Sequence, residues 1–416
     1  MAESRPRPDP SKVAPPGTGS LTTTQVNVLA NNLVAALSAG QVTGLTTTQI
    51  AGLTTTQLNK MESDDLRALS TAAIRALSTD QLKNLTTDQL AAMTTAQIAA
   101  MATQPTNQIG GLTTDAIKAL TTDQARALTS AQVGGFSTTQ VAAFDTDDLS
   151  ALNTAALRAL NTTQLAALNS DQIGALLTSQ VASLTTAQIN GLNSDDLNAL
   201  TTDQVKALTS AQAAAIGTTQ LAKMTTDDIE ALSTNAVRAL NSDQVKALTT
   251  DQVVALSTDQ AKALTTTQVA GLTTTQIANM QSDDVAALNT AALRGLNTTQ
   301  LAALNSDQIA ALSTAQVTSL TTAQINGLNS DDLNALTTAQ VRALTSAQAG
   351  AIGTTQLSKM TTDDVEALST NAVRALNSDQ VKALTTDQVV ALSTDQARAL
   401  TTTQVAGLTT AQVAAM

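Results

Sequence analysis

An eight-residue period is the feature that most constrains the fold of this chain. A large apolar residue recurs at every eighth position from Leu21 to Met101, and again from Leu112 to Met416. Between the two runs the register slips by three residues, in the segment MATQPTNQIGG that contains Pro105. A short period maintained along a whole chain is typical of solenoids, in which each repeat contacts only its neighbours.

The octapeptide has a preferred residue at nearly every position. Numbered from its apolar residue, it reads Leu, Thr/Ser/Asn, Thr/Ser, Asp/Thr/Ala, Gln, Val/Ile/Leu, a variable residue, and Ala or Gly, as in LTTDQVVA at 248–255. A continuous α-helix turns about 100° per residue, so a stripe of Leu eight residues apart would circle the helix and face no partner. In a flat strand, positions 1 and 6 would lie on opposite faces. Neither one long helix nor a flat strand therefore suits this pattern.

The same octapeptide contains a complete set of signals for starting a helix. Thr249 is a preferred N-cap residue, and Gln252 three residues later completes a capping box. Leu248 before the cap and Val253 at the fourth helical position form a hydrophobic staple. Asp251 lies in the first turn, where the helix dipole favours negative charge. We therefore predict an all-α solenoid of very short capped helices, one per octapeptide; a β-solenoid with a corner in each octapeptide is the alternative.

One octapeptide cannot fold alone. Burial of its Leu and Val stabilises it by about 3–5 kcal/mol at most, whereas ordering costs about 1.5 kcal/mol per residue. Isolated helices shorter than about 12 residues do not persist in water. Neighbouring octapeptides must therefore supply the rest of the core, and Ala or Gly at position 8 would let successive turns approach closely.

Basic side chains favour position 7, near the end of each predicted helix, where the dipole favours positive charge. They also lie three residues after the position-4 Asp, a weakly stabilising spacing. Examples are Arg67, Arg75, Lys83, Arg238, Lys246 and Lys382.

The repeat pattern divides the chain. Residues 1–20 are rich in Pro and are expected to be a disordered or extended tail. Residues 21–111 form a first octapeptide-repeat solenoid with an irregular break at 102–111, and residues 112–416 form a second. Within the second, a block at 152–287 is duplicated at 288–416. The segment 29–42 is expected to lack the capping box and to be an atypical first cap of the solenoid.

Composition removes most enzyme chemistry. The 416 residues include no His and no Cys, so there is no imidazole base, thiolate nucleophile or zinc–thiolate site. The formal net charge of −12 argues against nucleic acid as a partner. No apolar window is long enough for a membrane span, and no Sec signal peptide is visible. We predict that the chain is not an enzyme, with no catalytic, cofactor-binding or metal-binding residues and no cofactor.

Pairs of Asp at positions 4 and 5 are the best polar clusters. Carboxylate oxygens could bind calcium, but no loop of alternating ligands with a Gly accompanies these pairs. The favoured interpretation is that they replace the Gln of the capping box and serve the helix N-terminus. The pairs are Asp64–Asp65, Asp147–Asp148, Asp195–Asp196, Asp227–Asp228, Asp283–Asp284, Asp331–Asp332 and Asp363–Asp364.

Two resemblances follow from the motif LTTDQVVAL. Its Leu-Thr-x-x-Gln-Val opening is similar to the first helix of TAL-effector repeats, but the 34-residue period and the base-reading residues of that family are missing. Across residues 21–416 the chain resembles bacterial octapeptide-repeat proteins built of LTTxQ(V/I)xAL units. That resemblance implies a large secreted or surface-associated bacterial product.

The sequence thus predicts a structural protein, extracellular or on a bacterial cell surface, that acts as a filament, stalk or matrix component. The expected partner is a second copy of the chain, associated end to end, since Met416 is the first residue of an unfinished octapeptide. The alternative function is a Thr-lined surface that binds ice or glycans.

Overall fold

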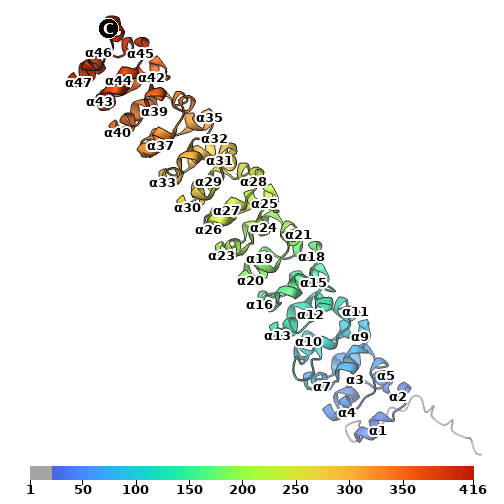
Figure 1. Cartoon of the computed structure of the whole chain (residues 1–416). Helices are drawn as coiled ribbons and strands as arrows, with labels where there is room; N and C mark the ends of the chain where they lie inside the picture. Colours follow the sequence, from blue (N-terminus) through green and yellow to red (C-terminus); the bar gives the residue numbers. More distant parts are fainter. Residues whose placement is uncertain (1–20) are drawn as a thin grey trace, which may run out of the picture. The chain divides into compact units, whose positions relative to one another are not determined.

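The chain is all-α. A computed structural model describes residues 21–416, and the predicted tail at 1–20 lies outside them. The described residues form 48 α-helices and a 3-10 helix, η2 (Ile109–Gly111), with no strand among them (Figure 1). Each α-helix has four to six residues. The predicted solenoid of very short helices is confirmed, and the β-solenoid alternative is wrong.

The chain divides into two compact units, which end and begin at Ala207 and Leu208. The α-helices of unit 1 are α1 Thr23–Asn27, α2 Asn31–Val34, α3 Ala39–Thr43, α4 Thr47–Ala51, α5 Thr55–Asn59, α6 Ser63–Ala68, α7 Thr71–Ala76, α8 Thr79–Lys83, α9 Thr87–Ala92, α10 Thr95–Ala100, α11 Thr114–Lys118, α12 Thr122–Ala127, α13 Ser130–Gly134, α14 Thr138–Val141, α15 Thr146–Ala151, α16 Thr154–Arg158, α17 Thr162–Leu165, α18 Ser170–Gly174, α19 Thr178–Ser183, α20 Thr186–Gly191, α21 Ser194–Asn198 and α22 Thr202–Lys206.

Unit 2 continues the same series. Its α-helices are α23 Ser210–Ala215, α24 Thr218–Leu221, α25 Thr226–Ala231, α26 Thr234–Ala239, α27 Ser242–Ala247, α28 Thr250–Val254, α29 Thr258–Ala263, α30 Thr266–Gly271, α31 Thr274–Asn279, α32 Ser282–Ala287, α33 Thr290–Gly295, α34 Thr298–Leu301, α35 Ser306–Ala311, α36 Thr314–Ser319, α37 Thr322–Gly327, α38 Ser330–Asn334, α39 Thr338–Ala343, α40 Ser346–Gly350, α41 Thr354–Leu357, α42 Thr362–Ala367, α43 Thr370–Ala375, α44 Ser378–Ala383, α45 Thr386–Val390, α46 Thr394–Ala399, α47 Thr402–Ala406 and α48 Thr410–Ala415.

Helix α28 shows how the octapeptide starts and stops a helix. The Thr249 hydroxyl accepts a hydrogen bond from the Gln252 N–H at 3.2 Å, and the Gln252 Oε1 accepts one from the Thr249 N–H at 2.8 Å. The helix ends at Val254, because the next N-cap, Ser257, is extended (φ −72°, ψ 156°) and begins another helix. The predicted capping box is therefore present, and the start signal of each octapeptide ends the helix before it.

Positions 1 and 6 build the core of each unit. Leu248 and Val253 are 5% and 0% exposed, and the same two positions are buried along most of both units. Gln252 at position 5 is also buried. Burial of an amide between two apolar positions was not predicted from the sequence, and it requires hydrogen-bond partners inside the solenoid.

Helices three apart in the series pack on one another within each unit. In unit 1, α7 contacts α10 and α13 contacts α16; in unit 2, α27 contacts α30 and α30 contacts α33 (Figure 1). The packing is close at position 8, as predicted. A Cβ added at Gly271 would lie 3.0 Å from the Cβ of Ser242, on the neighbouring turn.

The break in the octapeptide register forms an exposed loop. Between Met101 and η2, residues 104–107 are exposed, and Asn107 has a positive φ of 43°. Gln108 and Ile109 are both 0% exposed, so they occupy the core as positions 5 and 6 of an octapeptide do. The irregular break is thus confined to a few surface residues.

The prediction for 29–42 is wrong in part. Helix α2 has Ala30 as its N-cap and no side-chain cap, as expected. However, the Ser38 N–H donates to the Gln41 Oε1 at 2.9 Å at the start of α3. Helix α1 precedes both and has a full capping box of Thr22 and Gln25. The segment therefore contains one uncapped helix, α2, and the regular start of α3, and α1 precedes it in the series.

Candidate functional site

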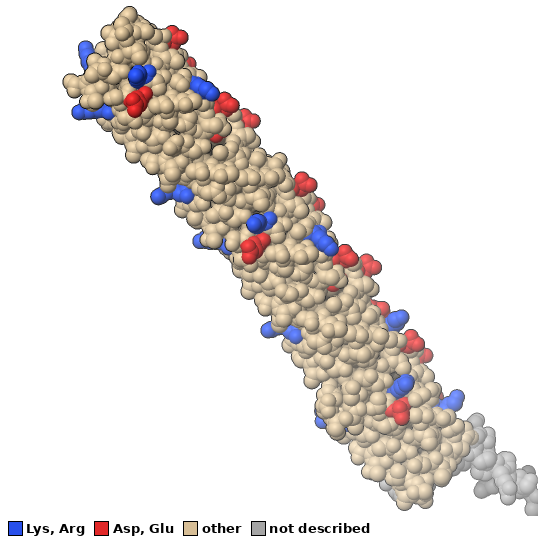
Figure 2. Space-filling model, in the orientation of Figure 1, with Lys and Arg blue, Asp and Glu red and all other residues tan. Residues whose placement is uncertain are grey.

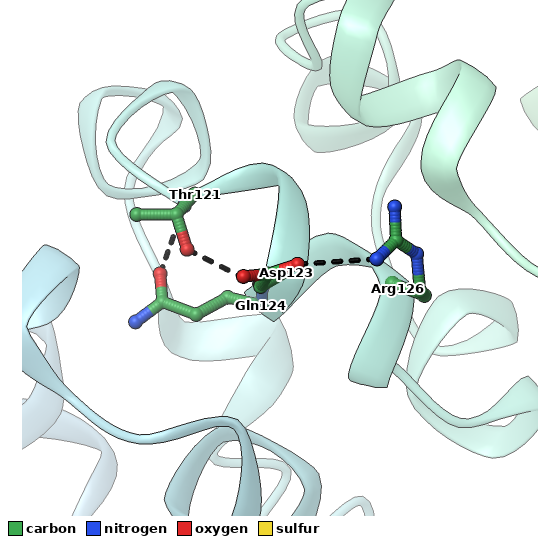
Figure 3. A network of polar contacts seen from close by, with 4 residues as sticks. All are labelled: Thr121, Asp123, Gln124 and Arg126. Carbon is green, nitrogen blue, oxygen red and sulfur yellow. Dashed lines mark hydrogen bonds and ion pairs between the residues drawn. The ribbon is translucent and has the colours of Figure 1, made fainter.

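The buried Gln at position 5 makes hydrogen bonds both within its own octapeptide and to an earlier turn. In α12, the Thr121 N–H donates to the Gln124 Oε1 at 2.9 Å, and the Gln124 N–H donates to the Thr121 hydroxyl at 3.3 Å. Asp123 lies between them in sequence but points outward to Arg126, 3.1 Å away (Figure 3). One end of the Gln amide is thus used for capping, and its NH₂ group remains to be satisfied.

The NH₂ group of this amide bonds to another turn. Gln124 Nε2 donates to the carbonyls of Leu90, Ala91 and Met93, at 2.9, 3.2 and 2.7 Å. These carbonyls lie at and just after the end of α9, where a short helix leaves its last C=O groups without partners in the helix. Each position-5 Gln of this kind therefore caps its own helix at the N-terminus and an earlier helix at the C-terminus. We call this contact the inter-turn bond.

The inter-turn bond recurs with a fixed offset. Gln252 Nε2 donates to the carbonyls 31 and 28 residues earlier, Leu221 and Met224, at 2.9 and 2.7 Å. Gln308 Nε2 donates across the same two offsets to Ile277 and Met280 at 2.9 and 2.6 Å. Because the partners lie between three and four octapeptides back, the bond joins one turn of the solenoid to the next.

An amide can make both contacts, whereas an ionised carboxylate cannot. A Glu side chain could accept from the N-cap N–H, and capping boxes accept Glu as readily as Gln. Glu has no donor when ionised, so it would place an anion against carbonyl oxygens. Among residues 21–416, position 5 contains Gln, Asp or Ala, apart from Leu33 and the Pro105 of the break, and it never contains Glu. That exclusion is the signal from which sequence reasoning could have found the inter-turn bond.

The Asp pairs divide between surface and core. The position-4 member, such as Asp195, is exposed, whereas the position-5 member, such as Asp196, is buried. Asp196 Oδ2 accepts from the Asn193 N–H at 3.1 Å, in the manner of the capping-box Gln. Asp332 does the same with Asn329 at 2.9 Å. The structural interpretation of these pairs is confirmed at such positions.

Burial shifts the acidity of the position-5 carboxyls. Desolvation is the largest cause in each case, and it raises the pKa because it disfavours the charged form. Thr122 and Thr258 donate to Asp148 and Asp284 and partly offset the effect. The carboxyls with a raised pKa are Asp65, Asp148, Asp196, Asp284, Asp332 and Asp364.

Some octapeptides have Ala at position 5, and their N-cap can take over the inter-turn role. Asn153 caps α16 by accepting from the Ala156 N–H at 2.9 Å, and its Nδ2 donates to the Leu128 carbonyl at 3.1 Å. Asn289 makes the equivalent bond to the Leu264 carbonyl at 3.2 Å. An Asn N-cap therefore caps its own helix and donates to a carbonyl of an earlier turn, as a position-5 Gln does, although its side chain is shorter.

The two ion pairs among the described residues lie on the surface. Arg398 lies 4.0 Å from Asp395, and both of these side chains, like Arg126 and Asp123, are largely exposed, so such pairs contribute little to stability. Figure 2 shows charged side chains as separate groups within a largely uncharged surface. Within 21–416, no group of three or more acidic side chains is placed to hold a metal ion, and no helix is long and apolar enough to cross a membrane.

A groove in unit 2 forms a polar recess in the surface. It has a volume of about 590 Å³ and is bordered by α27, α30, α31 and α34. Ser242, Thr274 and Thr298 line it, together with Asp243 and Lys246. The groove contains no aromatic ring and can offer hydrogen bonds and one charge of each sign.

Comparisons with curated proteins and with solved structures do not identify a relative of this chain. No curated protein matches the chain. A solved structure described as "Structure of APUM23-GGAAUUGACGG" is 12% identical, with 91% of this chain and 90% of that chain covered, but its TM-score of 0.17 is too low to indicate a shared fold.

A family model for the ALTTAQ repeat matches the chain repeatedly. The matches lie at 58–95, 105–138, 117–146, 141–178, 191–226, 221–258, 277–314, 325–362, 357–394 and 389–416, which together cover more than half of the sequence. The six residues ALTTAQ occur in this chain at 335–340, across the junction of two octapeptides. The chain belongs to the ALTTAQ repeat family.

Proposed function

We propose that this chain is a non-enzymatic structural protein that acts as a filament, stalk or matrix component outside a bacterial cell. The observation that supports the proposal is the inter-turn bond. Each turn binds the one before it through the same donor and the same acceptors, so added octapeptides extend the solenoid without a new kind of contact. The duplicated block at 152–287 and 288–416 fits a protein in which length is useful.

Length is the property to test. A variant that lacks residues 152–287 removes whole octapeptides and leaves their register intact. Negative-stain microscopy of both chains should show particles that shorten in proportion to the residues removed. Compact particles of equal length would contradict the proposal. Surface labelling of the producing cells tests the location separately.

The proposal includes end-to-end association of copies. Helices α47 and α48 expose Val405 and Val413, which occupy the core position 6 in their octapeptides and are 49% and 55% exposed. Burial against another copy would remove this apolar surface from water. Replacement of both by Ser should lower the association measured by sedimentation. Leu177→Ser, at a side chain 52% exposed on an N-cap, is the matched control and should have no effect.

A hydroxyl-lined surface for glycans or ice is the second candidate, and the groove in unit 2 supports it. Cap hydroxyls such as that of Thr273 already accept a bond from the Gln276 N–H, which leaves hydroxyls at positions 3 and 4 for a ligand; Thr274 and Thr298 are the position-3 residues of the groove. Thr274→Val with Thr298→Val should abolish binding on a glycan array if this groove is the site. Thermal hysteresis tests the ice alternative, and its absence from the wild-type chain would contradict that role.

A further inference from the structure

Two buried carboxyls stand where the inter-turn bond is made elsewhere. Asp65 in α6 and Asp284 in α32 occupy position 5 of their octapeptides and are 4% and 2% exposed. The Oδ2 atom of each is buried and has no hydrogen-bond partner. An unsatisfied buried oxygen is costly, and native structures retain few of them.

The flanking Gln residues show what each Asp replaces. One octapeptide before Asp65, Gln57 Nε2 donates to the carbonyls of Val26 and Leu29, at offsets of 31 and 28 residues. The same offsets from Asp65 lead to the carbonyls of Val34 and Leu37. Asp65 thus occupies the place in the series from which a Gln would donate to these two carbonyls, of which that of Val34 also accepts from the Leu37 N–H at 3.3 Å.

Asp284 is placed in the same way in unit 2. One octapeptide earlier, Gln276 Nε2 donates to the carbonyls of Val245 and Leu248 at 3.3 and 2.7 Å. The equivalent acceptors for Asp284 are Val253 and Leu256. Gln281, the N-cap of α32, already donates to the Val254 carbonyl between them at 2.9 Å. Gln281 therefore makes part of the inter-turn bond in this octapeptide, and the carbonyls of Val253 and Leu256 are left for Asp284.

An ionised carboxylate has no donor for these acceptors, whereas a neutral carboxyl has one O–H. The end of a short helix is also the negative end of its dipole, which disfavours an anion there. We propose that Asp65 and Asp284 are pH-dependent contacts between turns of the solenoid: protonation of the carboxyl completes the inter-turn bond, and ionisation breaks it.

The charged surroundings of Asp65 favour the protonated form. Helix α6 packs on α3, which has no charged residue, and on α9, whose Asp88 is exposed. On α6 itself, Glu62 and Asp64 add negative charge near the buried oxygen, and Arg67 is exposed.

The surroundings of Asp284 are similar. Helix α32 packs on α29, where Asp259 and Lys262 are exposed, and on α35, where Asp307 is exposed. Asp283 adds a like charge next to the buried group. Of these neighbours, the one cation is on the surface, so the buried oxygen is more readily satisfied by a proton than by an ion pair.

The direction of the pH effect follows from burial. Burial raises the pKa of Asp65 and Asp284 above the ordinary 3.8. Stabilisation from such a group is fully present below its unfolded pKa and is lost as the pH rises through the higher folded pKa. Each unit of pKa difference changes the stability of the folded turn about tenfold as an equilibrium constant. The contacts between turns should therefore be tighter in acid than at neutral pH.

Local hydrogen exchange in the full chain tests this inference. Asp284→Gln installs the residue that most other octapeptides have, so the variant should fold. At about pH 7.5, amides of α32 should exchange about threefold to tenfold more slowly in the variant than in the wild type; at about pH 4 the two should be equal. An exposed carboxylate on the packed helix α35 gives the control: Asp307→Asn should leave the ratio of its exchange rates to the wild-type rates the same at both pH values. Asp65→Gln repeats the test at α6.

Two results would overturn the proposal. One is a rate ratio between Asp284→Gln and wild type that does not change with pH. The other is wild-type exchange at about pH 7.5 that slows with added potassium or calcium chloride but not with choline chloride at equal ionic strength, since a bound cation would then satisfy the oxygen.

Discussion

The regular octapeptide at 248–255 and the break at 101–111 differ in length but make the same bond. Gln252 caps a residue three positions earlier, whereas Gln108 Oε1 accepts from the Ala102 N–H, six positions earlier, at 2.6 Å. Gln108 Nε2 still reaches the carbonyls of Ile74 and Leu77. The solenoid therefore tolerates extra residues between cap and Gln, provided that the amide keeps its place between two turns.

The octapeptides after the break show how the extra residues are accommodated. Those that face the break bond to carbonyls three residues further back, as Gln124 does with Leu90 at an offset of 34 residues. By Gln140 the usual offset of 28 residues to Leu112 has returned. An extra three residues in the chain are thus absorbed within one turn. The comparison indicates that position of the Gln amide in space, and not strict periodicity, maintains the solenoid.

Deletion of three residues from each region should distinguish the two regions most clearly. Removal of 103–105 leaves MATNQIGG, which has the regular length of eight residues with Gln at position 5, and should preserve the protection of neighbouring amides from hydrogen exchange. Removal of 249–251 eliminates a cap and displaces Gln252, at an expected cost of about 3 kcal/mol or more in local stability. Equal losses of protection in the two deletions would show that the break has a structural role of its own.

A smaller effect separates the two Thr residues of one octapeptide. Thr249→Ala removes the hydroxyl that caps α28 and should cost about 1 kcal/mol in the local free energy of opening. Thr250→Ala, at the first helical position, should change that free energy by less than about 0.5 kcal/mol. Hydrogen exchange of the α28 amides measures both. A reversed order would mean that capping does not limit the stability of these helices.

The smallest expected effect concerns the Asn caps. Asn153→Ser keeps an oxygen for the cap of α16 but loses the donor to the Leu128 carbonyl, so local stability should fall by about 0.5–1 kcal/mol. Asn161→Ser is the matched control, because Gln164 makes the inter-turn bond in that octapeptide, to the Phe136 carbonyl. Similar losses at the two sites would contradict the assignment of an inter-turn role to Asn153.

Most of the local fold was predictable from sequence because it is written in every octapeptide. Cap, return bond and apolar positions are local signals, and Thr249, Gln252 and Val253 lie where those signals place them. The inter-turn bond was not predicted, since it joins residues about 28 apart whose proximity depends on the superhelix. The capping box alone is enough to explain a Gln at position 5, and the absence of Glu there is the one sign of the bond from its Nε2 to an earlier turn. The prediction that 29–42 lacks a capping box was wrong in part, because only α2 is uncapped, whereas Ser38 and Gln41 form a regular capping box.

The function is less accessible than the fold for a related reason. A repeated octapeptide specifies how turns stack, while a partner would be recognised by departures from the repeat. Within residues 21–416 such departures include the exposed loop at 104–107 and the buried Asp65 and Asp284. They are the positions at which experiments on partners and regulation should begin.

Replacement of Gln124 by Glu and by Ala, compared at about pH 7.5, tests the inter-turn bond most directly. A simple capping box accepts Glu, and negative charge near a helix N-terminus is favourable, so capping alone predicts that Glu is better than Ala. The inter-turn bond predicts the opposite order. Glu would face three carbonyl oxygens and should cost about 3 kcal/mol, whereas Ala is found naturally at this position in other octapeptides and should cost about 1–2 kcal/mol. Hydrogen exchange in α9 and α12 measures the difference; greater protection with Glu than with Ala would contradict the account.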